Sequence, residues 1–259
     1  MGISIIIYEA AAKRGDKQAQ YWMGQSLQHI DPQASLKWLM GLAHQGDTKA
    51  MKTLALGYCS VGAYGENPEK ELYWYLEAGK LGDAEAQYCV GREYVIKKDF
   101  ESAWEWYAKA SEQGYTKGTI GLADLLIKKG ERYVEEIDQK YHYDFANALY
   151  QQEREQAKIK CGETCVEAEN LLFDILDGEY YYEDAAKALD MLGDLYRYNR
   201  FYDSAPKYEL AVQYYYMATL FDEEDDLISK SKMERLIEQQ KLEIPQSQFD
   251  EWKRAALDE

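Results

Sequence analysis

The residues of this chain that could do chemistry are few and widely spaced. Two of the four cysteines, Cys161 and Cys165, are four residues apart, a spacing that a redox pair or half of a metal site can use. No histidine is near them, and Cys59 and Cys89 are distant in sequence. Reduced, buried thiols are therefore the expected state, and the redox or metal pair stays as the alternative.

The histidines do not form a catalytic or metal-binding pattern. His29, His44 and His142 are far apart, and none has a companion at a metal-ligand spacing. No glycine-rich phosphate loop follows a strand, and no serine, cysteine or lysine stands in a recognisable nucleophile context. The sequence therefore predicts no catalytic residue, no cofactor and no metal, and a protein that is not an enzyme.

A repeat in the first half of the chain sets the elements that position any site. A marker glycine recurs at positions 15, 46, 82 and 114, at spacings of 31, 36 and 32 residues. Small residues follow it at a fixed offset of four, and bulky residues precede it at a fixed offset of eight. Such a period is typical of stacked helix pairs, and the small residues allow a neighbouring helix to approach closely.

Capping residues predict where these helices begin and end. An aspartate after the marker glycine starts one helix, and an Asp or Asn seven residues before the repeat tryptophan starts the other. Glycine tolerates the left-handed conformation that ends a helix. The predicted caps are Asp16, Asp47 and Asp83 for the first helix of each pair, and Asp31, Asn67 and Asp99 for the second.

The best copy of the repeat spans residues 83–114 and resembles the Sel1-like repeat, a relative of the tetratricopeptide repeat, in its bacterial type. The residues that carry the resemblance are Ala86, Gly91, Tyr94, Asp99, Ala103, Trp106, Tyr107, Ala110 and Gly114. The resemblance implies an all-α fold, a right-handed α-solenoid of stacked antiparallel helix pairs. It also implies an interaction protein, since such stacks expose long binding faces and rarely carry chemistry.

The repeat pattern divides the chain into four parts. Residues 1–130 are expected to hold four repeat units, the first incomplete, and residues 131–183 a divergent helical continuation. A further repeat is expected over residues 184–222. Residues 223–259 are expected to form capping helices that are broken at Pro245.

Acidic residues gather in the second half. The 259 residues carry a net charge of −17, of which residues 1–130 contribute −1 and residues 131–259 contribute −16. Such a field repels nucleic acid and anionic lipid and attracts a basic protein surface. Solubility alone is the alternative explanation, and the acidic run 222–226 could simply cap the next helix.

The first helix of each pair lines the concave face of such a stack, so its outward residues are the candidates for contact with a partner protein. Aromatic and arginine side chains are the usual anchors. The candidate partner-binding residues are Tyr21, Gln25, Tyr88, Arg92, Asp124, Asp190, Asp194 and Arg197.

Two functions fit these features. The first is an immunity or inhibitor protein that binds and neutralises a cognate, basic bacterial toxin or effector, because bacterial Sel1-like proteins include such antidotes. The alternative is an adaptor or scaffold in bacterial signalling, envelope assembly or protein quality control. No signal peptide or transmembrane segment is visible, which favours the cytoplasm, and the periplasm is the alternative if an upstream signal has been removed.

Overall fold

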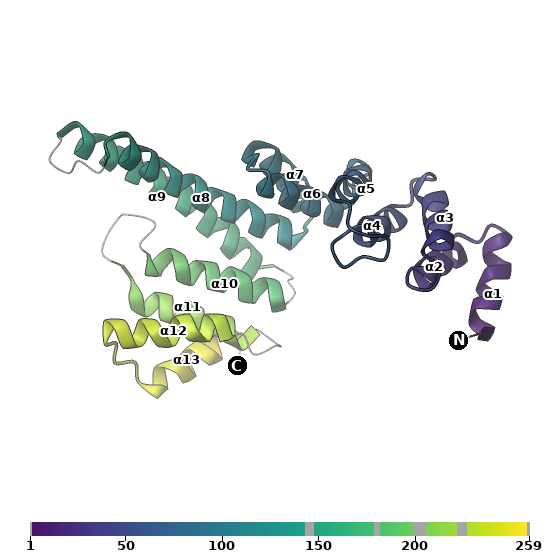
Figure 1. The fold of residues 1–259 in the computed structure, drawn as a ribbon. Helices are drawn as coiled ribbons and strands as arrows, with labels where there is room; N and C mark the ends of the chain where they lie inside the picture. The colour runs from purple at the N-terminus through teal and green to yellow at the C-terminus, as the bar shows by residue number, and fades with distance from the viewer. Residues whose placement is uncertain (1, 143–147, 179–181, 199–205, 222–226, 258–259) are drawn as a thin grey trace. The chain divides into compact units, whose positions relative to one another are not determined.

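The computed structural model describes residues 2–142, 148–178, 182–198, 206–221 and 227–257, which form thirteen α-helices and no strand (Figure 1). The all-α fold class predicted from the sequence is confirmed. The chain divides into two compact units, residues 1–115 and residues 116–259. The acidic run 222–226 lies outside the described residues.

The first unit consists of one leading helix and three antiparallel helix pairs, each pair packing against its neighbours along the chain. Every pair comprises a first helix after the marker glycine and a second helix before the next one. The helices are α1 (Gly2–Lys13), α2 (Lys17–Leu27), α3 (Pro32–Ala43), α4 (Thr48–Gly57), α5 (Pro68–Lys80), α6 (Ala84–Ile96) and α7 (Phe100–Glu112).

The predicted caps begin these helices. The carboxylates of Asp16, Asp47 and Asp83 accept hydrogen bonds from the backbone N–H three residues on, over 2.7, 2.9 and 3.0 Å. The second helices begin in the same way, at Asp31, Asn67 and Asp99. All four marker glycines have φ between +75° and +96°, the region that a Cβ atom disfavours, so each one allows the tight turn into the next pair.

Each helix pair closes on a small residue of its first helix. A Cβ atom at Gly24 of α2 would stand 2.6 Å from the Leu39 side chain of α3, closer than real Cβ contacts come. A Cβ atom at Gly91 of α6 would likewise stand 2.4 Å from the Tyr107 ring of α7. Leu39 is fully buried and Tyr107 is 5% exposed. The close approach that the sequence predicts at these positions is therefore present.

The second unit begins with two long helices and continues with shorter pairs. Its helices are α8 (Thr116–Lys140), α9 (Ala148–Leu176), α10 (Tyr182–Arg197), α11 (Tyr208–Phe221), α12 (Leu227–Gln240) and α13 (Gln246–Leu257). The α10–α11 pair repeats the contact of the first unit, because a Cβ at Gly193 would stand 2.5 Å from the Tyr215 ring. The expected domain boundary at residue 130 falls inside α8, and the expected break at Pro245 lies between α12 and α13.

The α8–α9 hairpin is pinned by a buried carboxylate. Asp138 of α8 accepts hydrogen bonds from the Tyr150 hydroxyl and from Nε of Arg154, both on α9 and both at 2.7 Å. Burial acts to raise the pKa of Asp138, but the bonds from Arg154 and Tyr150 outweigh it and hold that pKa below its usual range. The ionised carboxylate therefore stabilises the hairpin.

We expect the replacement Gly91→Ala to lower the free energy of unfolding by about 1–3 kcal/mol, because the added methyl group must displace the Tyr107 ring. Gly41→Ala is the matched control. Gly41 lies in α3 with open space around it, so alanine there is neutral or stabilising by up to about 1 kcal/mol. Urea denaturation of both variants measures the difference, and equal stability would contradict a tight seam.

We expect Asp138→Asn to cost about 2 kcal/mol at pH 7, since Arg154 then loses its buried anionic partner. The pKa of Asp138 is lowered in the fold. The stability it supplies is therefore present above about pH 4, where a free aspartate ionises, and is lost as the pH falls through the lower folded pKa. The gap between wild type and variant should shrink below about pH 4 in pH-dependent denaturation.

Asp124→Asn serves as the control for this measurement. Asp124 lies on the same helix and makes an exposed ion pair with Lys128, of the kind that contributes less than about 1 kcal/mol. A loss at Asp124 as large as that at Asp138 would show that burial of the carboxylate is not the cause.

Candidate protein-binding surface

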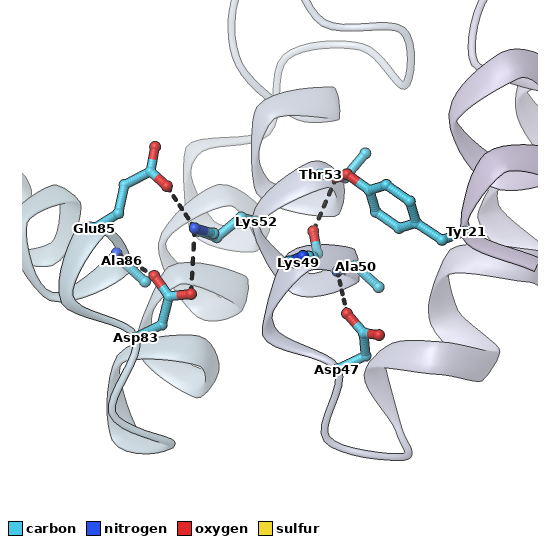
Figure 2. Close-up of polar contacts among 9 residues, drawn as sticks. All are labelled: Tyr21, Asp47, Lys49, Ala50, Lys52, Thr53, Asp83, Glu85 and Ala86. Carbon is cyan, nitrogen blue, oxygen red and sulfur yellow. Dashed lines mark hydrogen bonds and ion pairs between the residues drawn. The ribbon is translucent and has the colours of Figure 1, made fainter. Parts of the chain in front are cut away.

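Polar contacts join the first helices of successive pairs in the first unit (Figure 2). The Tyr21 hydroxyl of α2 lies 3.1 Å from Oγ1 of Thr53 on α4. Thr53 already donates its hydroxyl hydrogen to the Lys49 carbonyl at 2.9 Å, so Tyr21 is the donor in the bond between helices. Tyr21 is half-buried and links α2 to α4.

Lys52 makes the corresponding link from α4 to α6. Its ammonium group pairs with Oδ2 of Asp83 at 3.2 Å and with the Glu85 carboxylate (Figure 2). The other oxygen of Asp83 caps α6. One carboxylate therefore both caps the start of α6 and makes an ion pair with Lys52 of α4. Burial lowers the pKa of Lys52, but the two carboxylates outweigh this and raise it, so the link stays charged at neutral pH.

The candidate residues of the first unit fall into two groups. Gln25 and Arg92 are exposed, and their side chains are available to a partner. Tyr88 is half-buried and stacks on Tyr107, with ring centroids 5.7 Å apart. Tyr21 is held in the helix link. The two tyrosines therefore support the surface from which Gln25 and Arg92 project.

The candidate residues predicted from the sequence omit Leu56. This side chain of α4 is 57% exposed and stands ten residues after its marker glycine, the offset that Gln25 and Arg92 occupy in their own repeats. Comparing this one offset across the copies would have identified it. We define the A-helix row as Gln25, Leu56 and Arg92. It offers an amide, an aliphatic group and a guanidinium on three linked helices.

The candidates of the second unit make contacts within that unit. Asp190 is buried and accepts hydrogen bonds from the Ser229 hydroxyl and the Lys232 ammonium, both at 2.8 Å. Asp194 accepts from Lys232 at 2.8 Å and from the Tyr215 hydroxyl at 2.7 Å. These two aspartates therefore attach α12 to α10.

Lys232 remains charged in that arrangement. Burial lowers its pKa, but the hydrogen bonds to Asp190 and Asp194 outweigh burial and raise the pKa above its ordinary value. Of the remaining candidates, Asp124 pairs with Lys128 at 2.6 Å, and the Arg197 guanidinium lies over the Tyr198 ring at 5.1 Å. The assignment of these residues to a partner stays a prediction.

The cysteines of this chain are buried or partly buried in the described residues. Cys161 and Cys165 are both fully buried in the core between α8, α9 and α10. Burial raises the pKa of the Cys89 thiol to about 11, which disfavours the reactive thiolate. Over the same described stretches, no group of three His, Cys, Asp or Glu residues could hold a metal ion.

Among the helices with described residues, none combines the length and the apolar character that crossing a bilayer requires.

By sequence, the chain is similar to a known protein over part of its length. No protein-family model matches the chain. A segment of 139 residues is 31% identical to chitin synthase regulatory factor 3 of Schizosaccharomyces pombe. The match covers 49% of this chain and 15% of that protein, so the chain spans only a small part of this relative.

Comparison by structure is more extensive. The protective antigen c5321 of uropathogenic Escherichia coli, which displays an SLR fold, matches 98% of this chain and 48% of its own, with a TM-score of 0.69 and 20% identity. A Sel1 repeat protein of Oxalobacter formigenes matches 84% of this chain and 78% of its own, with a TM-score of 0.53 and 20% identity. Together with the capped helix pairs and their small-residue contacts, these likenesses show that the chain has the Sel1-like repeat fold.

Proposed function

We propose that this chain is a non-enzymatic protein-binding module whose partner carries a basic surface. The observation that carries the protein-binding role is the A-helix row, in which adjacent helix pairs present outward side chains on a scaffold fixed by contacts between helices; the basic character of the partner rests on the charge of the second unit. A rigid scaffold lowers the entropic cost of binding, because few groups must be ordered when the partner arrives.

The charge of the second unit supports a basic partner. Residues 116–259 contain 18 Lys and Arg against 32 Asp and Glu, a net charge of −14. Only part of this charge is used within the unit, as at Asp138, Asp190 and Asp194. A field of this sign accelerates encounter with a positive surface and disfavours anionic partners such as nucleic acid.

The specific form of the proposal is an immunity-type inhibitor, which neutralises a basic toxin or effector by occluding it. Fast, charge-steered association suits a protein that must capture a toxin before it acts. Support for this form comes from the charge of the acidic second unit.

An adaptor or scaffold is the second candidate. The observation that favours it is the match to a fungal protein whose name describes a regulatory factor. An adaptor tethers its partner without abolishing the partner's activity. The two candidates therefore differ in stoichiometry and in the effect of binding, although both require a protein-binding surface.

We expect the immobilised chain to retain a basic protein from a lysate of its source organism at ~150 mM salt and to release it at ~1 M salt, where exposed charges are strongly screened. Mass spectrometry identifies the retained protein. One partner at 1:1 stoichiometry whose activity is lost on binding supports the inhibitor, and several partners that stay active support the adaptor. Retention of acidic proteins alone would contradict both forms of the proposal.

We expect the double variant Leu56→Ala/Arg92→Ala to weaken binding of the retained partner at least about tenfold, because it removes an exposed aliphatic contact and a guanidinium from the A-helix row. Met40→Ala is the control, since Met40 is an exposed side chain on α3, a second helix of a pair. Isothermal titration gives both affinities. Unchanged affinity in the double variant would remove the A-helix row from the binding site.

A further inference from the structure

We infer that the outward face of α9 is a docking surface for a basic amphipathic helix of a partner protein. This inference rests on the proposed function, because it takes the partner to be a positively charged protein. We call the surface the α9 outer face and define it by Gln152, Gln156, Ile159, Glu163, Val166 and Asn170.

The side of α9 opposite this face packs into the core of the second unit. The buried residues Ala157, Cys161, Cys165 and Leu172 pack against α8 and α10. Ile159 lies two residues from both Ala157 and Cys161, so at about 100° per residue it points away from them. Among the described residues, the side chains of the α9 outer face are exposed and lie outside the buried core.

Two aliphatic side chains on this face remain exposed to solvent. Ile159 is 58% exposed and Val166 is 45% exposed. They are seven residues apart, which is two helical turns and about 10 Å along the axis. A spacing of seven on one side of a long helix is the pattern with which a second helix packs side by side.

The face is long enough for such a partner. From Gln152 to Asn170 the helix rises about 27 Å, which matches a partner helix of about 18 residues. The buried cluster of Asp138, Tyr150 and Arg154 fixes the start of α9 on α8. The docking surface therefore lies on one continuous helix that is anchored at its start.

The charge along this face selects the partner. Glu163 and Glu167 are exposed beside the two aliphatic residues, and Asp174 and Glu155 extend the acidic margin. Two lysines offset part of this charge at one end, since Lys158 pairs with Glu155 at 3.2 Å and the exposed Lys160 stands beside Ile159. Lysine or arginine residues flanking an apolar stripe would pair with this margin, as they do along coiled coils.

A second copy of this chain is a poorer occupant. Two α9 outer faces packed together would bring two copies of Glu163 and Glu167 into one interface, and each copy would offer the lysines Lys160 and Lys158, of which Lys158 already pairs with Glu155. Repulsion between these like charges disfavours association of two copies. The same charges favour a basic helix from another protein.

The test uses a synthetic 21-residue peptide with Leu at the a and d positions of three heptads and Lys at the e and g positions. A permuted peptide of identical composition spreads the leucines around the helix. We expect the full-length chain to bind the first peptide at 1:1 stoichiometry and at least tenfold more tightly than the permuted one, as measured by fluorescence anisotropy. No binding, or equal binding of both peptides, would overturn the inference.

Two sets of variants locate the site. Ile159→Gln/Val166→Gln should weaken peptide binding at least tenfold, whereas Ile96→Gln, at a 68% exposed aliphatic residue of α6, should leave it unchanged. The double variant Glu163→Lys/Glu167→Lys should no longer bind the basic peptide. It should instead bind a version of the peptide with Glu at the e and g positions. Far-UV circular dichroism confirms that each variant is folded. Unchanged peptide binding by either double variant would refute this site.

Two further outcomes separate this inference from the proposed function. In the first, a lysate partner binds the double variant Ile159→Gln/Val166→Gln as tightly as it binds the wild type. That result would support the protein-binding function and would show that the α9 outer face is not its binding site. Concentration-dependent dimerisation of the wild type, lost in the same variant, would assign the face to a second copy and overturn the basic partner.

Discussion

The close contact between the two helices of a pair is the constraint on which the rest of this structure depends. At Gly24, Gly91 and Gly193 the backbone of one helix meets a large side chain of the next, and a Cβ atom would not fit without displacement. The ring or branched chain fills the space that the missing side chain leaves, so each pair packs densely. The contact recurs in both units, in the pairs α2–α3, α6–α7 and α10–α11.

Polar contacts then order the pairs relative to one another within the first unit. Tyr21 and Lys52 both reach from one first helix to the next, and Asp83 serves as helix cap and ion-pair partner together. Tyr21 and Lys52 stand six residues after their marker glycines, as the candidate Tyr88 does, yet they stabilise the stack. In the proposed function, contact with a partner is therefore assigned to exposed neighbours such as Leu56 and Arg92.

Local rules in the sequence predicted the repeat elements well because capping and glycine turns act over three or four residues. The caps of α2 to α7 and the break near Pro245 follow from such rules. The joining of Asp190 to Lys232 could not be predicted, since the two are 42 residues apart and a carboxylate on a first helix pairs equally well with a partner's cation. Leu56 was missed because its own chemistry is unremarkable and only the shared offset marks it.

The long α9 helix shows why a weakly amphipathic segment can be informative. Its core side has Cys161, Cys165 and Leu172 fully buried, whereas Ile159 and Val166 leave about half of their surface in solvent. In the proposed role these two aliphatic residues contact the partner helix, and the flanking carboxylates limit self-association and favour a basic partner. The same residues that keep the uncovered surface soluble thus determine the charge of the helix that can bind it.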